Sequence, residues 1–253
     1  MTLAYREPFL PDSQLSRWDA RWKLAALLLL GLGFALLSQP GAASVAVAIG
    51  LVLTRLGKVP LRAVRNRLAL VMFAVLPPLI VLPLTTGREG AGWTVGDFFI
   101  SETGLIAAGT IALRTLAIGC LALVVLRTGP LPLTLAAAHA LRLPGVAVQV
   151  AQLTYRYTFV FFDEIRRLRI ALRTRGFRAR ANLGTYRTMG NAVGTLLVRG
   201  GDRAERVADA MRCRGFDGRY HALTEFRTTA VDVLGFVLCV VVAVALMLWD
   251  RCW

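Results

Sequence analysis

Residues 105–126 read LIAAGTIALRTLAIGCLALVVL and contain one charged side chain, Arg114, in 22 positions. About 20 consecutive apolar residues are enough for an α-helix to cross the hydrocarbon core of a bilayer. This stretch is therefore expected to form a transmembrane helix.

The composition of the whole chain agrees with that expectation. Of the 253 residues 56% are hydrophobic and 18% are charged, and the mean hydropathy is +0.59; in a soluble domain about a quarter of the residues are charged. Further apolar stretches lie at 22–38, 41–56, 69–85 and 230–249. The predicted fold class is all-α, a polytopic membrane protein with about five transmembrane helices and an added set of cytoplasmic or interfacial amphipathic helices. Pro77 and Pro78 should kink or break the third span, because proline removes helix hydrogen bonds.

The loops between these stretches predict an orientation. The 55–67 connection has five basic residues and no acid, whereas 86–104 has one arginine and three acids. Residues 127–227 contain 18 arginines and seven acids. Since basic loops stay in the cytoplasm, we expect a cytoplasmic N-terminus and an external C-terminus. The chain accordingly divides into 1–126 with four spans and a cytoplasmic N-terminal segment, a basic cytoplasmic region 127–228, and a final span in 229–253.

The basic region has helical periodicity. A short helix is expected over about 131–142. The stretch 146–162 is long enough to suggest a sixth span, but that would place the following arginines outside; we expect an interfacial helix that continues to Gly176. Its apolar stripe is Phe161, Ile165, Leu168 and Leu172, spaced as on one helix face. Two further helices are expected at 188–199, with Met189, Ala192, Val193 and Leu196 on one face, and at 202–215, with Asp202 as N-cap and Glu205 at the third position.

Two nine-residue stretches in this region are nearly the same. Residues 172–180 read LRTRGFRAR and residues 211–219 read MRCRGFDGR, and they share Arg-x-Arg-Gly-Phe-x-x-Arg. Gly176 and Gly215 are predicted to end helices, because glycine adopts the left-handed conformation of a C-terminal cap, and arginines in a last turn oppose the negative end of the helix dipole. Since a helix end does not require the following phenylalanines, Phe177 and Phe216 are predicted to anchor a protein surface.

Other motifs limit the chemistry. There is no Gly-x-x-x-x-Gly-Lys-Ser/Thr nucleotide loop. No metal site is predicted on the two histidines, His139 and His221, which lie far apart and have no cysteine partner. The acids Asp202, Glu205 and Asp209 share one helix face and raise the alternative of a magnesium cluster, but capping and a pair between Asp209 and Arg212 explain them better. Arg114 should point inward, to a backbone carbonyl or to another subunit, with either a structural or a transport role.

The order of these motifs resembles a known family. TGPLPLTLAAAHALRLP at 128–144, TYRY and FFDEIRRLRIALRTRGF within 154–177, and DAMRCRGFDGRY at 209–220 are similar to the transmembrane (T) component of energy-coupling factor transporters, most closely the cobalt/nickel CbiQ type. In that family two Ala-Arg-Gly motifs end coupling helices, and each arginine docks into one cytoplasmic ATPase. The matching triplets are Thr174-Arg175-Gly176 and Cys213-Arg214-Gly215, each followed by the phenylalanine named above; both replace alanine with another small residue.

The resemblance implies a function. It implies a non-catalytic energy-coupling subunit of an ABC-type importer in the bacterial plasma membrane, for cobalt by preference and nickel as the alternative. Two ABC-type ATPases would hold ATP and magnesium, and a separate substrate-binding membrane subunit would hold the metal. The chain itself is expected to bind no cofactor, metal or nucleic acid and to contact membrane lipid. The alternatives are a lipid or polyprenyl-phosphate enzyme, a basic adaptor on anionic lipid or nucleic acid, and a T component for another micronutrient such as a vitamin.

Overall fold

The computed structural model describes residues 14–16, 18–85, 92–95, 98–178, 180–218, 226 and 228–252. Its contacts divide the chain into two compact units, which are described separately. The bundle unit comprises Glu7–Leu141 with Thr224–Trp253, and the coupling unit comprises Arg142–Leu223 with Met1–Arg6. The helix Leu131–Ala140 belongs to the bundle unit. Sequence analysis had placed it in the basic region 127–228.

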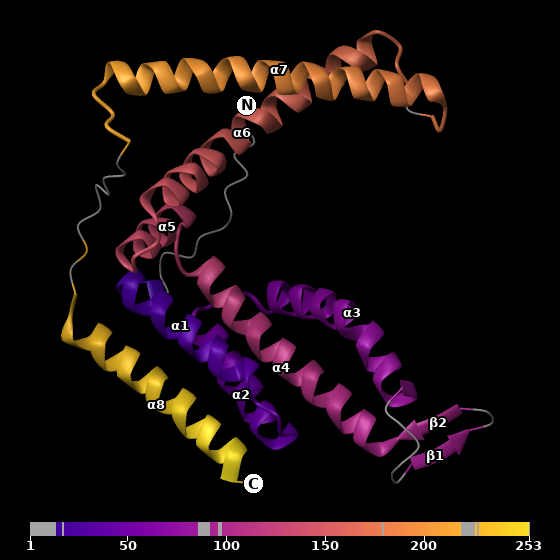
Figure 1. The fold of residues 1–253 in the computed structure, drawn as a ribbon, viewed down its shortest axis with the longest axis vertical. Helices are drawn as coiled ribbons and strands as arrows, with labels where there is room; N and C mark the ends of the chain where they lie inside the picture. Colours follow the sequence, from indigo (N-terminus) through magenta and orange to yellow (C-terminus); the bar gives the residue numbers. More distant parts are fainter. Residues whose placement is uncertain are drawn as a thin grey trace. The chain divides into compact units, whose positions relative to one another are not determined.

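The bundle unit is built from helices at each apolar stretch (Figure 1). They are α1 (Ala20–Ala35), α2 (Pro40–Leu56), α3 (Leu61–Thr85), α4 (Glu102–Arg127), α5 (Leu131–Ala140) and α8 (Ala230–Cys252), with a short 3-10 turn at Gln14–Ser16. The all-α class is confirmed. The sequence did not predict the antiparallel hairpin of β1 (Gly92–Val95) and β2 (Phe98–Ser101), in which Gly92 pairs with Ser101 and Val95 with Phe98.

The helices of the bundle unit differ in whether they are long and apolar enough to cross a membrane. Among the described residues, α4 and α8 are each long and apolar enough to cross a membrane, and the two halves of α3 together make a third. The helices α1 and α2 have 16 and 17 residues, fewer than the roughly 20 that a perpendicular crossing requires. The structure therefore supports a polytopic membrane protein without fixing the number of crossings at five.

The predicted kink in α3 is present. The segments Leu61–Phe73 and Val75–Pro83 are bent by 43° relative to each other. In an α-helix each N–H bonds to the carbonyl four residues earlier, so Pro77 and Pro78 leave the carbonyls of residues 73 and 74 without their donors. The bend thus falls where the two prolines remove hydrogen bonds.

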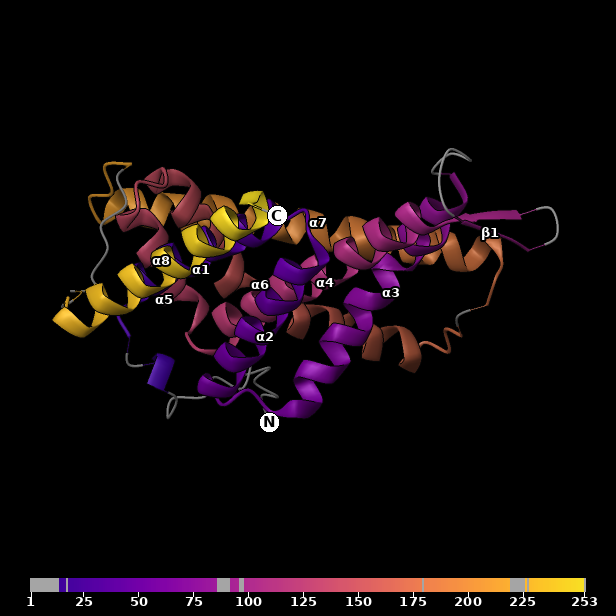
Figure 2. The same cartoon turned by 90° about the horizontal axis from the view of Figure 1, so that it is seen from below.

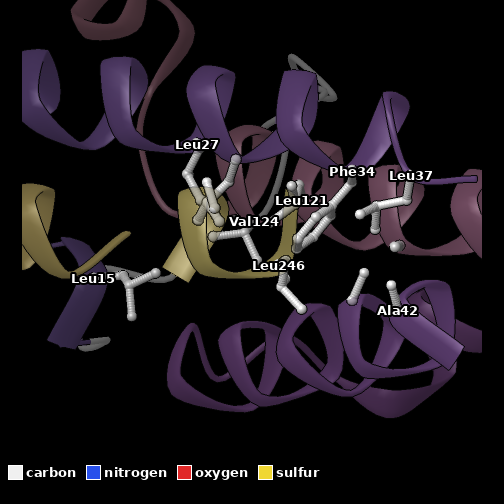
Figure 3. Packing of buried hydrophobic residues seen from close by; sticks show 12 residues of the cluster. Leu15, Leu27, Phe34, Leu37, Ala42, Leu121, Val124 and Leu246 are labelled. Carbon is white, nitrogen blue, oxygen red and sulfur yellow. The ribbon is translucent and has the colours of Figure 1, made fainter. Parts of the chain in front are cut away.

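The core of the bundle unit lies between α1, α2, α4 and α8 (Figure 3). Leu27, Phe34, Leu121 and Val124 are among its buried members, and α1 and α8 lie side by side in both views (Figures 1 and 2). Small residues bring the helices close together. A Cβ at Gly50 of α2 would lie 2.9 Å from Cys120 Cβ of α4, so this crossing requires glycine. Close backbone contact through small residues is the usual basis of helix packing in membranes.

The coupling unit contains two long helices, α6 (Gly145–Thr174) and α7 (Leu183–Cys213). The prediction of two helices at 188–199 and 202–215 was wrong, because α7 is continuous and its N-cap is Asn182, whose side chain accepts a hydrogen bond from Thr185 N at 2.9 Å. Asp202 therefore lies inside the helix. Two adjacent glycines cost a helix only about 1 kcal/mol each, and Gly200 is used for packing, since a Cβ there would lie 3.1 Å from the Phe161 ring.

The helices α6 and α7 run antiparallel and cross. Phe161 packs on Gly200, and Glu164 forms an ion pair with Arg199. Beyond this crossing, residues 165–178 face residues 189–196. Only Val148 of α6 and no residue of α7 is fully buried, so these two helices do not enclose a core between them.

Candidate functional site

The two repeated stretches form the same helix end. In each, a glycine with positive φ follows the cap, +75° for Gly176 and +79° for Gly215. The N–H of Phe177 donates to the Leu172 carbonyl and that of Gly176 to the Arg173 carbonyl, both at 3.0 Å. At the second end Phe216 donates to Met211 and Gly215 to Arg212, again both at 3.0 Å. This pair of bonds defines a Schellman motif, so the sequence repeat is a repeat of local structure.

The phenylalanines have a local role that the sequence argument overlooked. In a Schellman motif the residue after the glycine commonly contacts the apolar residue five positions earlier. Phe177 and Phe216 hold this position relative to Leu172 and Met211, so a helix end does have a use for phenylalanine there. Phe177 is half-buried, while Phe216 remains 37% exposed. Their role as anchors for a partner stays a prediction.

The two central arginines are presented to solvent. Arg175 and Arg214 are the C-cap residues of α6 and α7, and both are exposed. Neither pairs with a carboxylate among the described residues. The preceding residues are small: the Thr174 hydroxyl donates to the Ala171 carbonyl at 2.9 Å, and the Cys213 side chain is exposed. Each end therefore offers a guanidinium, a planar group that can donate several hydrogen bonds at once, beside a small side chain that allows close approach.

Antiparallel packing places the two ends far apart. Phe177 lines the same groove as Met189, which lies near the start of α7. Cys213 lies 24 residues beyond Met189 along α7, a distance of about 36 Å at 1.5 Å per residue. The coupling unit thus presents two copies of one motif at its opposite ends.

The groove between the helices, about 870 Å³ in volume, contains the predicted apolar stripes. Ile165, Leu168 and Leu172 of α6 face the α7 residues Met189, Ala192, Val193 and Leu196. Both stripes were predicted from periodicity, but the sequence did not show that they face each other. The Glu164–Arg199 ion pair beside the groove was also missed, because its partners are 35 residues apart.

On the acidic face of α7, the predicted pair between Asp209 and Arg212 is present, but the predicted capping by Asp202 and Glu205 is wrong. Arg212 Nη1 lies 3.4 Å from Asp209 Oδ1 on an exposed face. Asp202 and Glu205 do not cap a helix, since α7 begins 19 residues before Asp202. Among the described residues, no group of three or more histidine, cysteine, aspartate or glutamate side chains is arranged to hold a metal ion. His221 lies outside the described residues.

Arg114 has a backbone partner within the chain. Its Nη1 donates to the Ala35 carbonyl at 2.9 Å and to the Leu37 carbonyl at 3.1 Å. These carbonyls belong to the end of α1, where the last turn lacks intrahelical donors and a cation is favoured by the helix dipole. A backbone carbonyl was one of the partners that the sequence suggested; a role in transport stays a prediction.

Sequence analysis missed Asp250, which binds the same α1–α2 turn as Arg114. We call Arg114 and Asp250 together a clamp on this turn. The Asp250 carboxylate accepts hydrogen bonds from Ser38 N at 2.9 Å and Gln39 N at 2.8 Å, at the start of α2. The turn between α1 and α2 is therefore held by a cation from α4 and an anion from α8. The sequence gives one indication of this role, which is that Asp250 is an acid directly after the apolar stretch 230–249.

A second clamp lies at the other end of α1. Lys23 is 5% exposed, and its Nζ donates to the carbonyls of Leu15 at 3.3 Å and Thr128 at 3.2 Å. Asp232 is equally buried and accepts from Asp19 N at 3.1 Å, which joins the start of α8 to the start of α1. Together these bonds fix both ends of α1 within the bundle unit.

Comparisons with known proteins show the family to which the chain belongs. A family model described as "CbiQ: Cobalt transport protein" matches residues 11–225. The chain is 30% identical over 236 residues to "Cobalt transport protein CbiQ" of Rhodobacter capsulatus, covering 89% of this chain and 93% of that protein. It is 22% identical over 243 residues to an uncharacterized protein of Methanocaldococcus jannaschii, covering 94% of this chain and 83% of that one. Because the family model covers most of its length, the chain belongs to the CbiQ family of cobalt transport proteins.

Proposed function

We propose that this chain is the energy-coupling membrane subunit of a cobalt importer, with nickel as the alternative substrate, and that two ABC-type ATPase subunits drive it. The observation that carries the proposal is the pair of matching helix ends, each with an exposed arginine at the cap. The two ends repeat one motif and lie at opposite ends of the antiparallel pair of α6 and α7. This repetition of one exposed motif supports one ATPase at each end.

The helices between the two ends are suited to transmit movement. Since α6 and α7 are unbroken over 30 and 31 residues, a displacement of one end moves the whole helix. When the ATPases bind ATP with magnesium and close, the two arginines are drawn toward each other, and the crossing at Phe161 and Gly200 rotates. The clamps on α1 would hold the bundle unit rigid while this happens.

A separate membrane subunit would bind the metal. Large apolar side chains on both coupling helices are uncovered, among them Phe162 at 60%, Leu197 at 71% and Val198 at 65% exposure. Exposed apolar surface of this kind marks an interaction site, which supports contact with another membrane subunit and with lipid. In this proposal the chain binds no cofactor itself, and cobalt or nickel is selected elsewhere.

The helix directions in the bundle unit support the predicted orientation in a bacterial plasma membrane. The starts of α1 and α8 are joined through Asp19 and Asp232, and their ends through Ser38 and Asp250. The two helices are therefore parallel. If α1 begins in the cytoplasm, the last residues of α8 lie outside, as the distribution of basic residues predicts.

Charge reversal at the two caps tests the proposal. Arg175→Glu or Arg214→Glu in the full chain, co-expressed with the cognate ATPase, should reduce ATPase co-purification or uncouple ATP hydrolysis from cobalt uptake. Each loss should exceed the roughly 0–1 kcal/mol of an exposed ion pair, because the arginine would be desolvated in a pocket.

Arg178→Glu is the matched control, since Arg178 is exposed and lies close to the first motif. It should reduce binding less than either cap variant. Normal cobalt uptake by both cap variants would show that the arginines do not dock the ATPases.

A further inference from the structure

Four basic residues lie at the turn between α2 and α3, within the bundle unit. They are Arg55, Lys58, Arg62 and Arg65, and all four are exposed. None of them forms an ion pair among the described residues, and the sequence contains no acid from residue 20 to residue 88. The positive charge at this turn is therefore not neutralised by the neighbouring chain.

The turn that carries these residues has a fixed backbone. The N–H of Val59 donates to the Thr54 carbonyl at 3.1 Å, and Val59 itself is buried. The N–H of Lys58 donates to the Arg55 carbonyl at 2.9 Å. These two bonds form the Schellman motif that also ends α6 and α7, so the basic side chains extend from an ordered turn.

Lys58 occupies the position in this motif that glycine holds in α6 and α7. Its φ is +50°, in the left-handed region that is unfavourable for a side chain and open to glycine. A glycine would form the same turn with less strain but without a charge. The strain is offset if the ammonium group of Lys58 binds an anion, and the described part of the chain supplies no carboxylate for it.

Arg55 lies directly beyond an apolar surface of α2. Leu51 and Val52 precede it by four and three residues, on the same side of the helix, and both are exposed. Together with Leu56 these residues line one shallow hollow. On the other side of α2, Gly50 packs against α4. An apolar surface that ends in a cation therefore faces away from α4.

The first turns of α3 have the same order of side chains. Arg62 and Arg65 share one face with Phe73, which is 76% exposed, whereas Val64 on the opposite face is buried. Phe73 lies eleven positions beyond Arg62, a rise of about 16 Å. This face of α3 thus changes from basic to apolar along the helix, as a surface does that meets lipid headgroups at one level and acyl chains at the next.

We propose that this turn binds an anionic phospholipid, with its headgroup phosphate held by Arg55, Lys58, Arg62 and Arg65 and its acyl chains along the exposed apolar faces of α2 and α3. A ligand that fits both surfaces carries negative charge directly beside hydrocarbon, which is the chemistry of a lipid. Basic clusters beside membrane helices attract anionic lipids. The positive-inside bias requires only that a loop be basic, so it does not account for the ordered turn or the two aligned faces. The proposal goes beyond the proposed function and does not involve the ATPases.

Native mass spectrometry of the detergent-solubilised full chain tests the proposal, with phosphatidylglycerol as the probe and phosphatidylcholine for comparison. Phosphatidylglycerol should bind at least about fivefold more tightly, because basic residues near the headgroup attract its charge. Equal affinity for the two lipids would mean that the acyl chains alone account for binding, and it would overturn the proposal.

Single substitutions locate the site. Arg65→Gln should weaken phosphatidylglycerol binding about fivefold. Arg67→Gln is the matched control, since Arg67 is also exposed but lies about 200° around α3 from Arg65; it should weaken binding less than about twofold. Equal losses would show that the loop attracts lipid only through its total charge, contrary to the proposal.

Lys58→Gly separates binding from folding. Because glycine relieves the positive φ, the melting temperature without added lipid should not fall, while the affinity for phosphatidylglycerol should decrease about fivefold. Unchanged affinity would remove Lys58 from the site and contradict the proposal.

The basic face of α6 provides the remaining comparison. Arg166→Gln, Arg169→Gln and Arg173→Gln together remove three exposed charges and should leave the preference for phosphatidylglycerol intact. If this triple variant loses the preference and Arg65→Gln keeps it, the lipid binds at α6 and the proposal is overturned.

Discussion

The bundle unit and the coupling unit are both helical and both expose large apolar side chains, such as Phe73 at 76% and Leu197 at 71%, yet only the bundle unit encloses an apolar core. In the bundle unit Leu30, Phe34 and Val124 are at most 1% exposed, and charged residues close the helix ends from neighbouring helices. In the coupling unit Leu183 is 90% exposed and Leu197 is 71% exposed. The helices of the bundle unit therefore close a core, whereas Val148 is the one fully buried residue in the described part of the coupling unit. Substitutions in the bundle unit should therefore reduce stability, and substitutions in the coupling unit should reduce assembly or transport.

The largest effect is expected at the α2–α4 crossing. Gly50→Leu places a side chain where even a Cβ would lie 2.9 Å from Cys120, and overpacking of this kind costs about 3 kcal/mol or more. The melting temperature of the detergent-solubilised chain should fall sharply. Gly109→Leu is the control, because nothing lies within 4 Å of a Cβ at that α4 glycine. Equal melting temperatures for the two variants would contradict the close packing.

The clamp on the α1–α2 turn should give the next largest effect. Arg114→Leu removes two charge-assisted hydrogen bonds and leaves the carbonyls of Ala35 and Leu37 without this donor, at a cost of about 2 kcal/mol. Thermal unfolding measures the loss, and Arg251→Leu, at an exposed position near the end of α8, serves as the control. If Arg114→Leu abolishes cobalt uptake at unchanged stability, Arg114 has the transport role instead.

At the helix ends of the coupling unit, substitutions should reduce partner binding and leave the melting temperature nearly unchanged. Gly215→Ala forces a left-handed conformation on alanine at φ +79°, which costs about 1–2 kcal/mol locally. We expect reduced ATPase co-purification with little change in melting temperature, because the end contacts no core. Gly201→Ala, in the interior of the same helix and with nothing within 4 Å, should leave binding intact. A comparable loss with Gly201→Ala would mean that the cap geometry is not what matters.

The smallest effect on stability is expected on the uncovered face of α7. Leu197→Ser removes a side chain that is 71% exposed, so the free energy of unfolding should change by no more than about 0.5 kcal/mol. Cobalt uptake by the assembled transporter should nevertheless decrease if that face meets another subunit. A marked fall in the melting temperature of the isolated chain would show that Leu197 is covered within the chain.

Local patterns in the sequence were enough to predict most of the helices and the two glycine-capped helix ends. Apolar length predicted the helices of the bundle unit, proline chemistry predicted the bend in α3, and periodicity predicted the stripes that line the groove. Arg-Gly-Phe predicted where α6 and α7 end, because a left-handed glycine cap depends on neighbouring residues only. Local rules were sufficient wherever the interacting groups lie within a few residues of one another.

Contacts between groups that are distant in the chain became known from the three-dimensional structure. It showed that α7 is continuous through Gly200 and Gly201, since Phe161 of another helix uses the space that glycine leaves. It gave Arg114 and Asp250 their backbone partners, which lie 77 and 212 residues away in the chain. It also placed the two copies of the motif at opposite ends of an antiparallel pair. These features depend on packing between helices, and no local pattern of residues records which surfaces come into contact.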